Sequence, residues 1–242
     1  MIRVAAAGDL HFGTDSAGSL REPLADLPSH ADILLLAGDL TRRGEPAEAR
    51  VLADELGGLE IPVVSVLGNH DYESDREEEI TKILTEAGVT VLEGESTVVD
   101  VHGERLGVAG LKGFGGGFAG ACASDFGEPE MKAFIRHTQD GARRLSAALE
   151  DLEGVDVRVA LLHYSPIRET LQGEPLEIFP FLGSYLLAEA VDDPGADLVL
   201  HGHAHRGVEK GVTPGGVRVR NVAQHVIGRA YNIYELNCEP DC

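Results

Sequence analysis

The first third of the chain alternates between short apolar runs and longer stretches with helical spacing. Three runs have the length and composition of buried strands: residues 2–7, 33–37 and 63–67. Apolar positions in residues 45–56 recur every three or four residues, and Gly57 follows as a helix stop. A second helical pattern covers residues 75–87 and ends at Gly88. This alternation predicts a largely parallel sheet with helices packed outside it.

The middle of the chain has a different pattern. Short segments rich in β-branched residues predict strands of a second, mixed or antiparallel sheet: residues 89–92, 97–101 and 106–109. A glycine-rich stretch covers residues 113–120, and residues 128–152 then form a long helical pattern that Gly141 could bend or split. Beyond it we expect a helix at residues 182–191 and four strands, at residues 157–162, 197–200, 217–221 and 232–236. The length suits one domain over residues 1–242.

A polar motif follows directly on each of five predicted strands. The motifs are Asp9-Leu10-His11, Gly38-Asp39, Gly68-Asn69-His70-Asp71, His163 and Gly202-His203-Ala204-His205. In open α/β sheets, the loops beyond the carboxyl ends of the strands meet at one edge. Residues that are far apart in the sequence are therefore expected to converge there.

The motifs supply carboxylate, amide and imidazole groups and no thiolate. This mixture suits divalent Mn, Fe, Co, Ni or Zn better than Mg or Ca. Asp39 has two carboxylate oxygens, so it can bridge two ions, and two ions roughly 3.5–4 Å apart can support an in-line displacement at phosphorus. His70 adjoins Asn69 and is the candidate to protonate the leaving oxygen.

Together the five motifs resemble those of the calcineurin-like metallophosphoesterase superfamily. Each motif alone is weak, but all five stand in the right order between residues 9 and 205. The resemblance implies a four-layer αββα sandwich, with two mixed β-sheets flanked by helices. It also implies an enzyme that hydrolyses a phosphate ester through a hydroxide bridging two divalent metal ions.

The resemblance also implies a role for each motif residue. The first ion would be bound by Asp9, His11 and His205, the second by Asn69, His163 and His203, and both by Asp39. His70 would be the general acid, and Asp71 would orient it through a hydrogen bond. His163 lies in Leu162-His163-Tyr164-Ser165-Pro166, not in the Gly-His form of many relatives. The His-x-x-Pro form also occurs in the superfamily, so we keep His163 as a ligand.

Charge and composition narrow the substrate. The formal net charge is -21, and such an acidic surface repels nucleic-acid backbones and anionic membranes. No apolar run approaches the roughly 20 residues that cross a bilayer. We therefore expect a small phosphate ester, with a phosphodiester preferred, while a phosphomonoesterase and a nuclease are alternatives. A non-catalytic metal-binding module is the rival from another class, and the presence of His70 and every ligand argues against it.

The cysteines and the N-terminal run bear on the cellular compartment. Cys122, Cys238 and Cys242 are odd in number and contain no CxxC pair, which predicts no disulfide framework and a reducing cytoplasm. The apolar run at residues 2–7 is too short for a secretion signal and leads straight into Asp9, so it predicts a buried strand.

The remaining polar residues have weaker functional interpretations. Arg42 and Arg43 follow Asp39, and a guanidinium there could bind a substrate phosphate or simply be solvated. His201 and Asn221 could lie at the edge of the site or have a packing or turn role. Four histidines are expected to be unrelated to the site: His30, His102, His137 and His225.

The glycine-rich stretch contains a GxGxxG pattern at residues 115–120. A dinucleotide-binding fingerprint needs a helix that opens at this point, and the residues after Gly120 do not resemble a helix start. We instead expect a mobile loop that acts as a lid over the metals.

Overall fold

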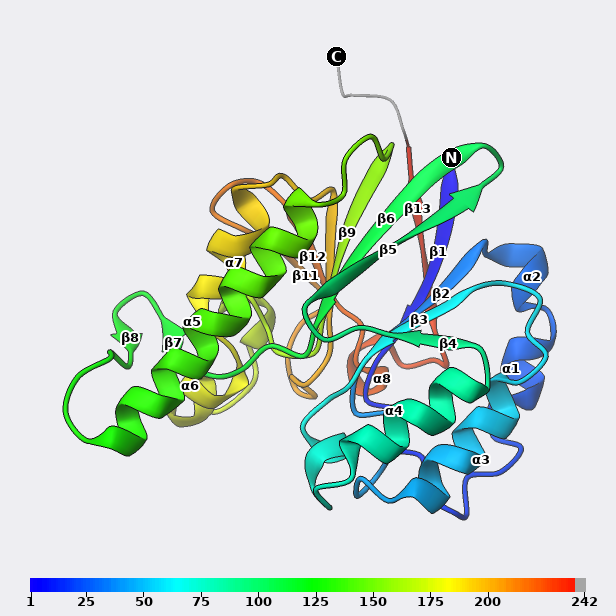
Figure 1. Ribbon diagram of the computed structural model, residues 1–242, viewed down its shortest axis with the longest axis horizontal. Coiled ribbons are helices and arrows are strands. Elements are labelled where there is room, and N and C mark those ends of the chain that lie inside the picture. The colour runs from blue at the N-terminus through cyan, green and yellow to red at the C-terminus, as the bar shows by residue number, and fades with distance from the viewer. Residues whose placement is uncertain (238–242) are drawn as a thin grey trace.

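The computed structural model describes residues 1–237 and contains two large sheets packed face to face (Figure 1). The first has the order β13-β1-β2-β3-β4. Its strands are β1 (Ile2–Ala7), β2 (Ile33–Ala37), β3 (Val63–Val66), β4 (Val89–Val91) and β13 (Asn232–Leu236). The first four pair in parallel, and β13 pairs antiparallel with β1.

The second sheet has the order β11-β12-β10-β9-β6-β5. Its strands are β5 (Glu95–Val101), β6 (Glu104–Leu111), β9 (Val157–Leu162), β10 (Leu198–His201), β11 (Lys210–Val212) and β12 (Arg218–Asn221). The central strands β12, β10, β9 and β6 are parallel, and both edge strands are antiparallel to their neighbours.

Helices cover the outer face of each sheet (Figure 1). The first sheet carries α1 (Arg21–Ala25), α2 (Leu27–His30), α3 (Pro46–Leu56) and α4 (Glu77–Glu86). The second carries α5 (Pro129–Glu150) and α7 (Tyr185–Asp192). The layers thus run helix, sheet, sheet, helix, which confirms the αββα sandwich expected from the sequence.

Strand β1 shows why these apolar runs form buried strands. Val4 and Ala6 face the space between the two sheets, whereas Ala5 and Ala7 pack toward the helices. Because a strand covered on both faces needs apolar residues at every position, it appears in the sequence as an unbroken apolar run. The N-terminal run is accordingly a core strand, as predicted.

The core between the sheets should be sensitive to truncation. Leu35 of β2 is fully buried there, so Leu35→Ala should lower the free energy of unfolding by about 2–5 kcal/mol through lost burial and a cavity. Urea denaturation measures this change. Val98 on β5 is 41% exposed, so Val98→Ala should stay within about 0.5 kcal/mol of the parent. Equal losses in both variants would contradict this placement of the core.

Two helices differ from the sequence prediction. Helix α5 runs unbroken through Gly141, where a Cβ would find only ordinary contact with Leu111. The helix expected at residues 182–191 is instead two helices, α6 (Phe179–Leu182) and α7, with Gly183 between them. A Cβ on Gly183 would lie 2.0 Å from the Ser165 carbonyl oxygen, so close contact with another loop interrupts the helix.

Several shorter elements were not predicted because they contain too few residues to show a period. They are α1, α2, β11, β7 (Gly117–Phe118), β8 (Ala121–Cys122), α8 (Gln224–Ile227) and the 3₁₀ turns η1 (His70–Tyr72), η2 (Glu169–Leu171) and η3 (Leu176–Ile178). Cys122 is exposed with a free thiol, whereas Cys238 and Cys242 lie outside the described residues. Within residues 1–237, the structure contains no helix with the length and apolarity required to cross a bilayer.

Candidate metal centre

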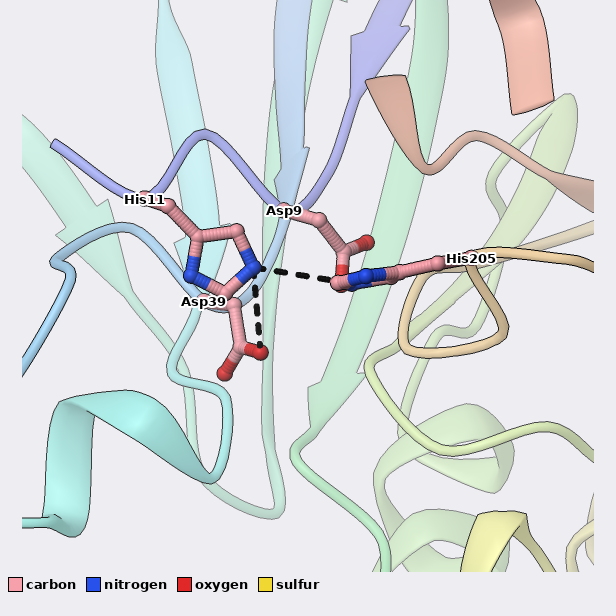
Figure 2. Close-up of side chains that lie close together, drawn as sticks. All are labelled: Asp9, His11, Asp39 and His205. Atoms are coloured by element: carbon pink, nitrogen blue, oxygen red, sulfur yellow. Dashed lines mark hydrogen bonds and ion pairs between the residues drawn. The ribbon is translucent and has the colours of Figure 1, made fainter. Parts of the chain in front are cut away.

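All five motifs lie where a strand ends, and the two sheets bring these ends together. Strands β1, β2 and β3 of the first sheet lead into the Asp9, Asp39 and Asn69 loops, and β9 and β10 of the second lead into the His163 and His203 loops. Figure 2 shows side chains from three of these loops pointing toward one another. The predicted convergence is therefore observed.

The first cluster consists of Asp9, His11, Asp39 and His205, whose ligand atoms all lie within 4.8 Å of one another (Figure 2). His205 Nε2 is 2.8 Å from Asp9 Oδ1 and 3.5 Å from His11 Nε2. His11 Nε2 is in turn 3.8 Å from Asp39 Oδ2. These atoms surround a space that a single ion could occupy.

The second cluster contains Asp39, His163 and His203, again with ligand atoms within 4.8 Å of one another. His163 Nε2 lies 3.4 Å from Asp39 Oδ1 and 2.9 Å from Asn69 Oδ1. Asp39 is thus common to both clusters, with Oδ2 nearer His11 and Oδ1 nearer His163. The structure brings all seven predicted ligands together in the predicted grouping.

The hydrogen bonds of His163 indicate that the second cluster fits a cation. His163 Nδ1 is 2.8 Å from the Ala37 carbonyl oxygen, which can only accept, so Nδ1 carries the proton. In the neutral ring, Nε2 then presents a lone pair to Oδ1, the side-chain amide oxygen of Asn69. Two electron pairs directed at one point form a site for a positive ion, and a second ring nitrogen bonded to a backbone carbonyl is typical of metal-binding histidines.

The electrostatic environment favours the metal-binding protonation state at three of the predicted ligands, whereas the hydrogen bond with Asp9 raises the pKa of His205. Burial lowers the pKa of His203 to about 3, with the neighbouring His163 adding to the effect, and burial also lowers the pKa of His11. Burial opposes ionisation of Asp9, but the hydrogen bond from His205 and the charges of nearby histidines outweigh it and lower the Asp9 pKa. Neutral imidazoles and ionised carboxylates are the forms that bind metal.

The backbone is strained at the same residues. Among the described residues, six that are not glycine have positive φ, and four of these are ligands: Asp9 (58°), His11 (45°), Asp39 (49°) and His203 (69°). Such conformations are sparsely populated and persist where the surrounding structure enforces them, commonly at functional sites. The loops therefore hold these side chains in position at some cost in backbone energy.

At two positions in the motifs, steric crowding requires glycine. A Cβ on Gly68 would lie 2.1 Å from Asp39 Oδ1, and a Cβ on Gly202 would lie 2.3 Å from Asp9 Oδ2. No other residue fits at such distances. The glycine that precedes Asn69 and the one that precedes His203 therefore allow one ligand loop to lie directly against another.

His70 lies beside the clusters but belongs to neither. Its backbone N–H donates to Asp39 Oδ1 at 2.8 Å, and its ring meets the His11 ring edge-on with centroids 4.6 Å apart. His70 Nδ1 is 2.9 Å from the Arg42 carbonyl oxygen, so Nδ1 donates a hydrogen bond there. Nε2 is left for proton transfer on a side chain that is 40% exposed.

Asp71 has different partners from those predicted. Its carboxylate accepts hydrogen bonds from the backbone N–H groups of Leu40, Thr41 and Gly68 at 3.1, 2.7 and 2.7 Å, and from the Thr41 hydroxyl at 2.6 Å. The expected hydrogen bond to His70 is wrong, because in the 3₁₀ turn η1 the Asp71 side chain is buried while that of His70 points outward. Through these hydrogen bonds, Asp71 instead connects the loop that contains Asp39 to the loop that begins at Gly68.

Replacement of Asp71 by asparagine should therefore destabilise the fold. The amide NH₂ group would face backbone N–H groups that now donate to a carboxylate, and leaving buried donors unpaired costs about 1–3 kcal/mol. Urea denaturation of the metal-free protein measures the change. Asp75→Asn, at an exposed position of the same segment, is the matched control and should have little effect. Equal stability of the two variants would contradict this role of Asp71.

The contacts of the two predicted phosphate-binding arginines are with residues outside the two clusters. The Arg42 guanidinium forms an ion pair with Asp15 at 2.9 Å, and the Arg43 backbone N–H donates to Glu48 Oε2 at 2.8 Å. The main-chain carbonyl of Arg42 contributes to the site, since it accepts the hydrogen bond from His70. A role for either side chain in binding a substrate phosphate stays a prediction.

His201 and Asn221 stabilise the loop that contains His203 and His205. His201 is fully buried, with Nε2 2.9 Å from Thr170 Oγ1, and burial lowers its pKa to about 4. Asn221 is also buried, and its amide donates to the Ala204 carbonyl oxygen at 2.8 Å, between the two ligands His203 and His205. Both residues thus have packing and turn roles, which were among the alternatives expected.

The glycine-rich stretch is hydrogen-bonded to the segment around α6, and its expected role as a lid stays a prediction. Residues 115–118 are buried. The Gly116 N–H donates to the Pro180 carbonyl at 2.7 Å, and the Gly117 N–H donates to the Gly183 carbonyl at 2.9 Å. The stretch then enters the β7–β8 hairpin, so the strand-to-helix turn of a dinucleotide fingerprint is not formed here.

Three residues next to the predicted ligands were not identified from the sequence, and the expectation that His225 is unrelated to the site is wrong. His225 stacks on His205 with centroids 4.4 Å apart and planes 9° apart, and Tyr164 packs on His203 with centroids 4.3 Å apart. Lys112 is buried with Nζ over the rings of Tyr72, Phe114 and Tyr164. His225 follows the end of β12, so the rule used for the other motifs could have found it. No spacing pattern in the sequence identifies Lys112 as a residue near the site.

Comparisons with known proteins agree with this geometry. The sequence profile of the calcineurin-like phosphoesterase family matches residues 2–207. A curated relative, the uncharacterized protein YpbG of Bacillus subtilis (strain 168), is 24% identical over 182 residues, or 74% of this chain and 53% of that protein. This chain thus spans about half the length of that relative.

Two solved structures share the fold. Phosphopantetheinyl hydrolase (PptH) from Mycobacterium tuberculosis has a TM-score of 0.67 at 19% identity, over 91% of this chain and 88% of that one. The TT1561 protein of Thermus thermophilus has a TM-score of 0.61 at 17% identity, over 98% and 99%. The family profile covers every ligand from Asp9 to His205. The chain belongs to the calcineurin-like phosphoesterase family.

Proposed function

We propose that this chain hydrolyses a small phosphodiester, with two divalent transition-metal ions bound by the seven ligands and His70 as the general acid. The observation that carries the proposal is the sharing of Asp39 between two ligand clusters, with a histidine beside both and a member of neither. Mn, Fe, Zn, Co and Ni all suit a site of carboxylate, amide and imidazole ligands. We expect the protein to act in the cytoplasm.

Charge in the site supports an anionic substrate despite the acidic surface. When bound, two divalent ions would lower the pKa of a water molecule and neutralise charge on the phosphate. Only Asp9 and Asp39 among the seven ligands carry negative charge, so the loaded site would be positive. A diester brings a single negative charge to a chain whose net charge is -21, which favours it over a monoester or a polyanion.

The residues around His70 suit proton donation. The hydrogen bond from Nδ1 to the Arg42 carbonyl fixes the ring and leaves Nε2 available on a side chain that is 40% exposed. A protonated His70 can therefore deliver a proton from Nε2 to the leaving oxygen as its bond to phosphorus breaks. His11 supports the ring from the side, with centroids 4.6 Å apart.

A metal analysis and a turnover screen test the proposal. Elemental analysis after loading with Mn should give about two ions per chain, as a binuclear site requires. Bis-p-nitrophenyl phosphate should be hydrolysed faster than p-nitrophenyl phosphate, cyclic nucleotides or single-stranded DNA. Absence of bound metal would refute the site. Metal binding without turnover of any substrate would support the non-catalytic module, and preference for the monoester would refute the diester assignment.

A further inference from the structure

An exposed apolar segment borders the metal centre. Within six residues, three large apolar side chains are open to solvent: Leu176 (68% exposed), Ile178 (37%) and Phe181 (61%). We call these three side chains the apolar ridge. Isolated exposed apolar residues are ordinary, but a contiguous group next to a site commonly marks a binding surface.

The segment that carries the apolar ridge, residues 174–181, is hydrogen-bonded at both ends to the loop that contains His203 and His205. At one end, Glu174 Oε1 accepts a hydrogen bond from the Arg206 N–H at 2.7 Å. At the other, the Phe181 carbonyl oxygen lies 3.3 Å from His203 Nε2 and accepts a hydrogen bond from it. The ridge therefore runs alongside the ligand loop, within reach of a molecule whose phosphate is bound there.

The backbone segment that carries the apolar ridge also accepts hydrogen bonds from two other loops. The Gly116 N–H donates to the Pro180 carbonyl, and the Ser165 N–H donates to the Leu182 carbonyl at 3.0 Å. Ser165 lies two residues after the ligand His163, so this bond ties the ridge to a second ligand loop. The exposed side chains thus stand on a backbone that is fixed relative to both clusters, and their exposure is not a consequence of a loose loop.

A row of aromatic rings continues from the ridge back to the metal ligands. The ring centroids are 6.4 Å apart for Phe181 and Phe134, 4.9 Å for Phe134 and Phe114, and 5.8 Å for Phe114 and Tyr164. Tyr164 in turn packs on His203 with centroids 4.3 Å apart. An aromatic row therefore leads from the ridge to His203, with the Lys112 Nζ over the Phe114 and Tyr164 rings.

We propose that the apolar ridge binds an uncharged aromatic or alkyl arm of the substrate. The substrate would then be a phosphate ester with one phosphoryl group and one apolar substituent, which deepens the proposed function and rests on it. Glu174 and Glu177 flank Leu176 and would repel a second phosphate group. The ridge thus selects against nucleic acids and polyphosphates as well as for an apolar arm.

A binding measurement tests the ridge independently of catalysis. Methylphosphonate and hexylphosphonate, which are not hydrolysed, are titrated calorimetrically into the Mn-loaded protein. Each fully buried methylene contributes about fourfold in affinity, so partial burial of the hexyl chain should give at least about tenfold tighter binding. Phenylphosphonate tests whether an aromatic arm is preferred to an alkyl arm. Equal affinities of all three compounds would overturn the proposal.

Variants locate the effect on the ridge. Phe181→Ser and Leu176→Ser should each reduce the hexyl-to-methyl affinity ratio to less than about threefold. Both side chains are mostly exposed, so either variant tests the proposal if the other fails to fold. Val98→Ser is the matched control, since Val98 is 41% exposed on β5, a strand that carries no site residue, and it should leave the ratio unchanged. An unchanged ratio in both ridge variants would overturn the proposal.

Turnover distinguishes failure of the ridge from failure of the proposed function. Methyl and hexyl p-nitrophenyl phosphate are compared by release of p-nitrophenolate. Equal kcat/KM values for the two diesters would overturn the ridge and leave the hydrolase proposal standing. No turnover of either diester, with tighter hexylphosphonate binding retained, would contradict diester hydrolysis and leave the ridge standing.

Discussion

Asp39→Asn should remove bound metal and lower the turnover of bis-p-nitrophenyl phosphate by at least about a hundredfold. Asp39 directs Oδ2 toward His11 and Oδ1 toward His163, so it is the group common to both clusters. An asparagine retains the shape but offers one neutral oxygen and an NH₂ group that cannot bind a cation. Loss of a residue that only supports a metal ligand costs about 10–100-fold, and loss of a shared ligand should cost more.

Elemental analysis and turnover measured on the same samples check this expectation. Asp54→Asn, at an exposed position on α3, is the matched control and should retain both metal and activity. Circular dichroism establishes that each variant is folded. If Asp39→Asn retained two ions per chain, Asp39 would not bridge the clusters, and loss of one ion alone would assign Asp39 to a single cluster.

The convergence of the predicted ligands could be foreseen because it depends on strand topology more than on side-chain packing. Asp9 follows β1 and His163 follows β9, and these strands belong to different sheets. In each sheet, the parallel strands must end at the same edge, and stacking the sheets places the two edges side by side. A polar residue directly after a buried apolar run is therefore visible in the sequence without knowledge of the contacts that position it.

The contacts that were not predicted depend on the directions in which individual side chains and loops point, and the sequence does not specify these directions. Asp71 directly follows His70, yet the 3₁₀ turn η1 sends one side chain into the core and the other outward. Gly183 interrupts a helical pattern because the Ser165 carbonyl lies against it, and Ser165 is distant in the sequence. Such contacts form only when separate loops pack together, so neither pattern nor propensity reveals them.

The apolar ridge could not be predicted for a related reason. Leu176, Ile178 and Phe181 look in the sequence like ordinary core positions, and Phe179 beside them is indeed buried. Their exposure becomes apparent only once the hydrogen bonds from Arg206 and His203 fix the segment along the ligand loop. The motifs thus support the proposed reaction, while the packing of the loops supports the proposed substrate class.

His70→Ala should lower kcat by about 10²–10⁴-fold while the metal content stays at that of the parent. Positioned acid catalysis typically contributes this factor. The His70 side chain is outside both ligand clusters, and the backbone N–H that donates to Asp39 is retained in alanine. His102→Ala is the matched control, because His102 is an exposed histidine paired with Asp32, away from the motifs. Loss of metal from His70→Ala would mean that His70 is a ligand.

The leaving group separates proton donation by His70 from a merely structural role. p-Nitrophenolate is stable without a proton at neutral pH, whereas an alkoxide is not, so an acid matters most for a poor leaving group. His70→Ala should therefore reduce the hydrolysis of a dialkyl phosphate more than that of bis-p-nitrophenyl phosphate, as measured by single-substrate kcat values. Because Nδ1 already donates to the Arg42 carbonyl, the proton must leave from Nε2. Equal losses on both substrates would contradict general-acid catalysis and would favour a role for the His70 ring in positioning His11, which it contacts edge-on.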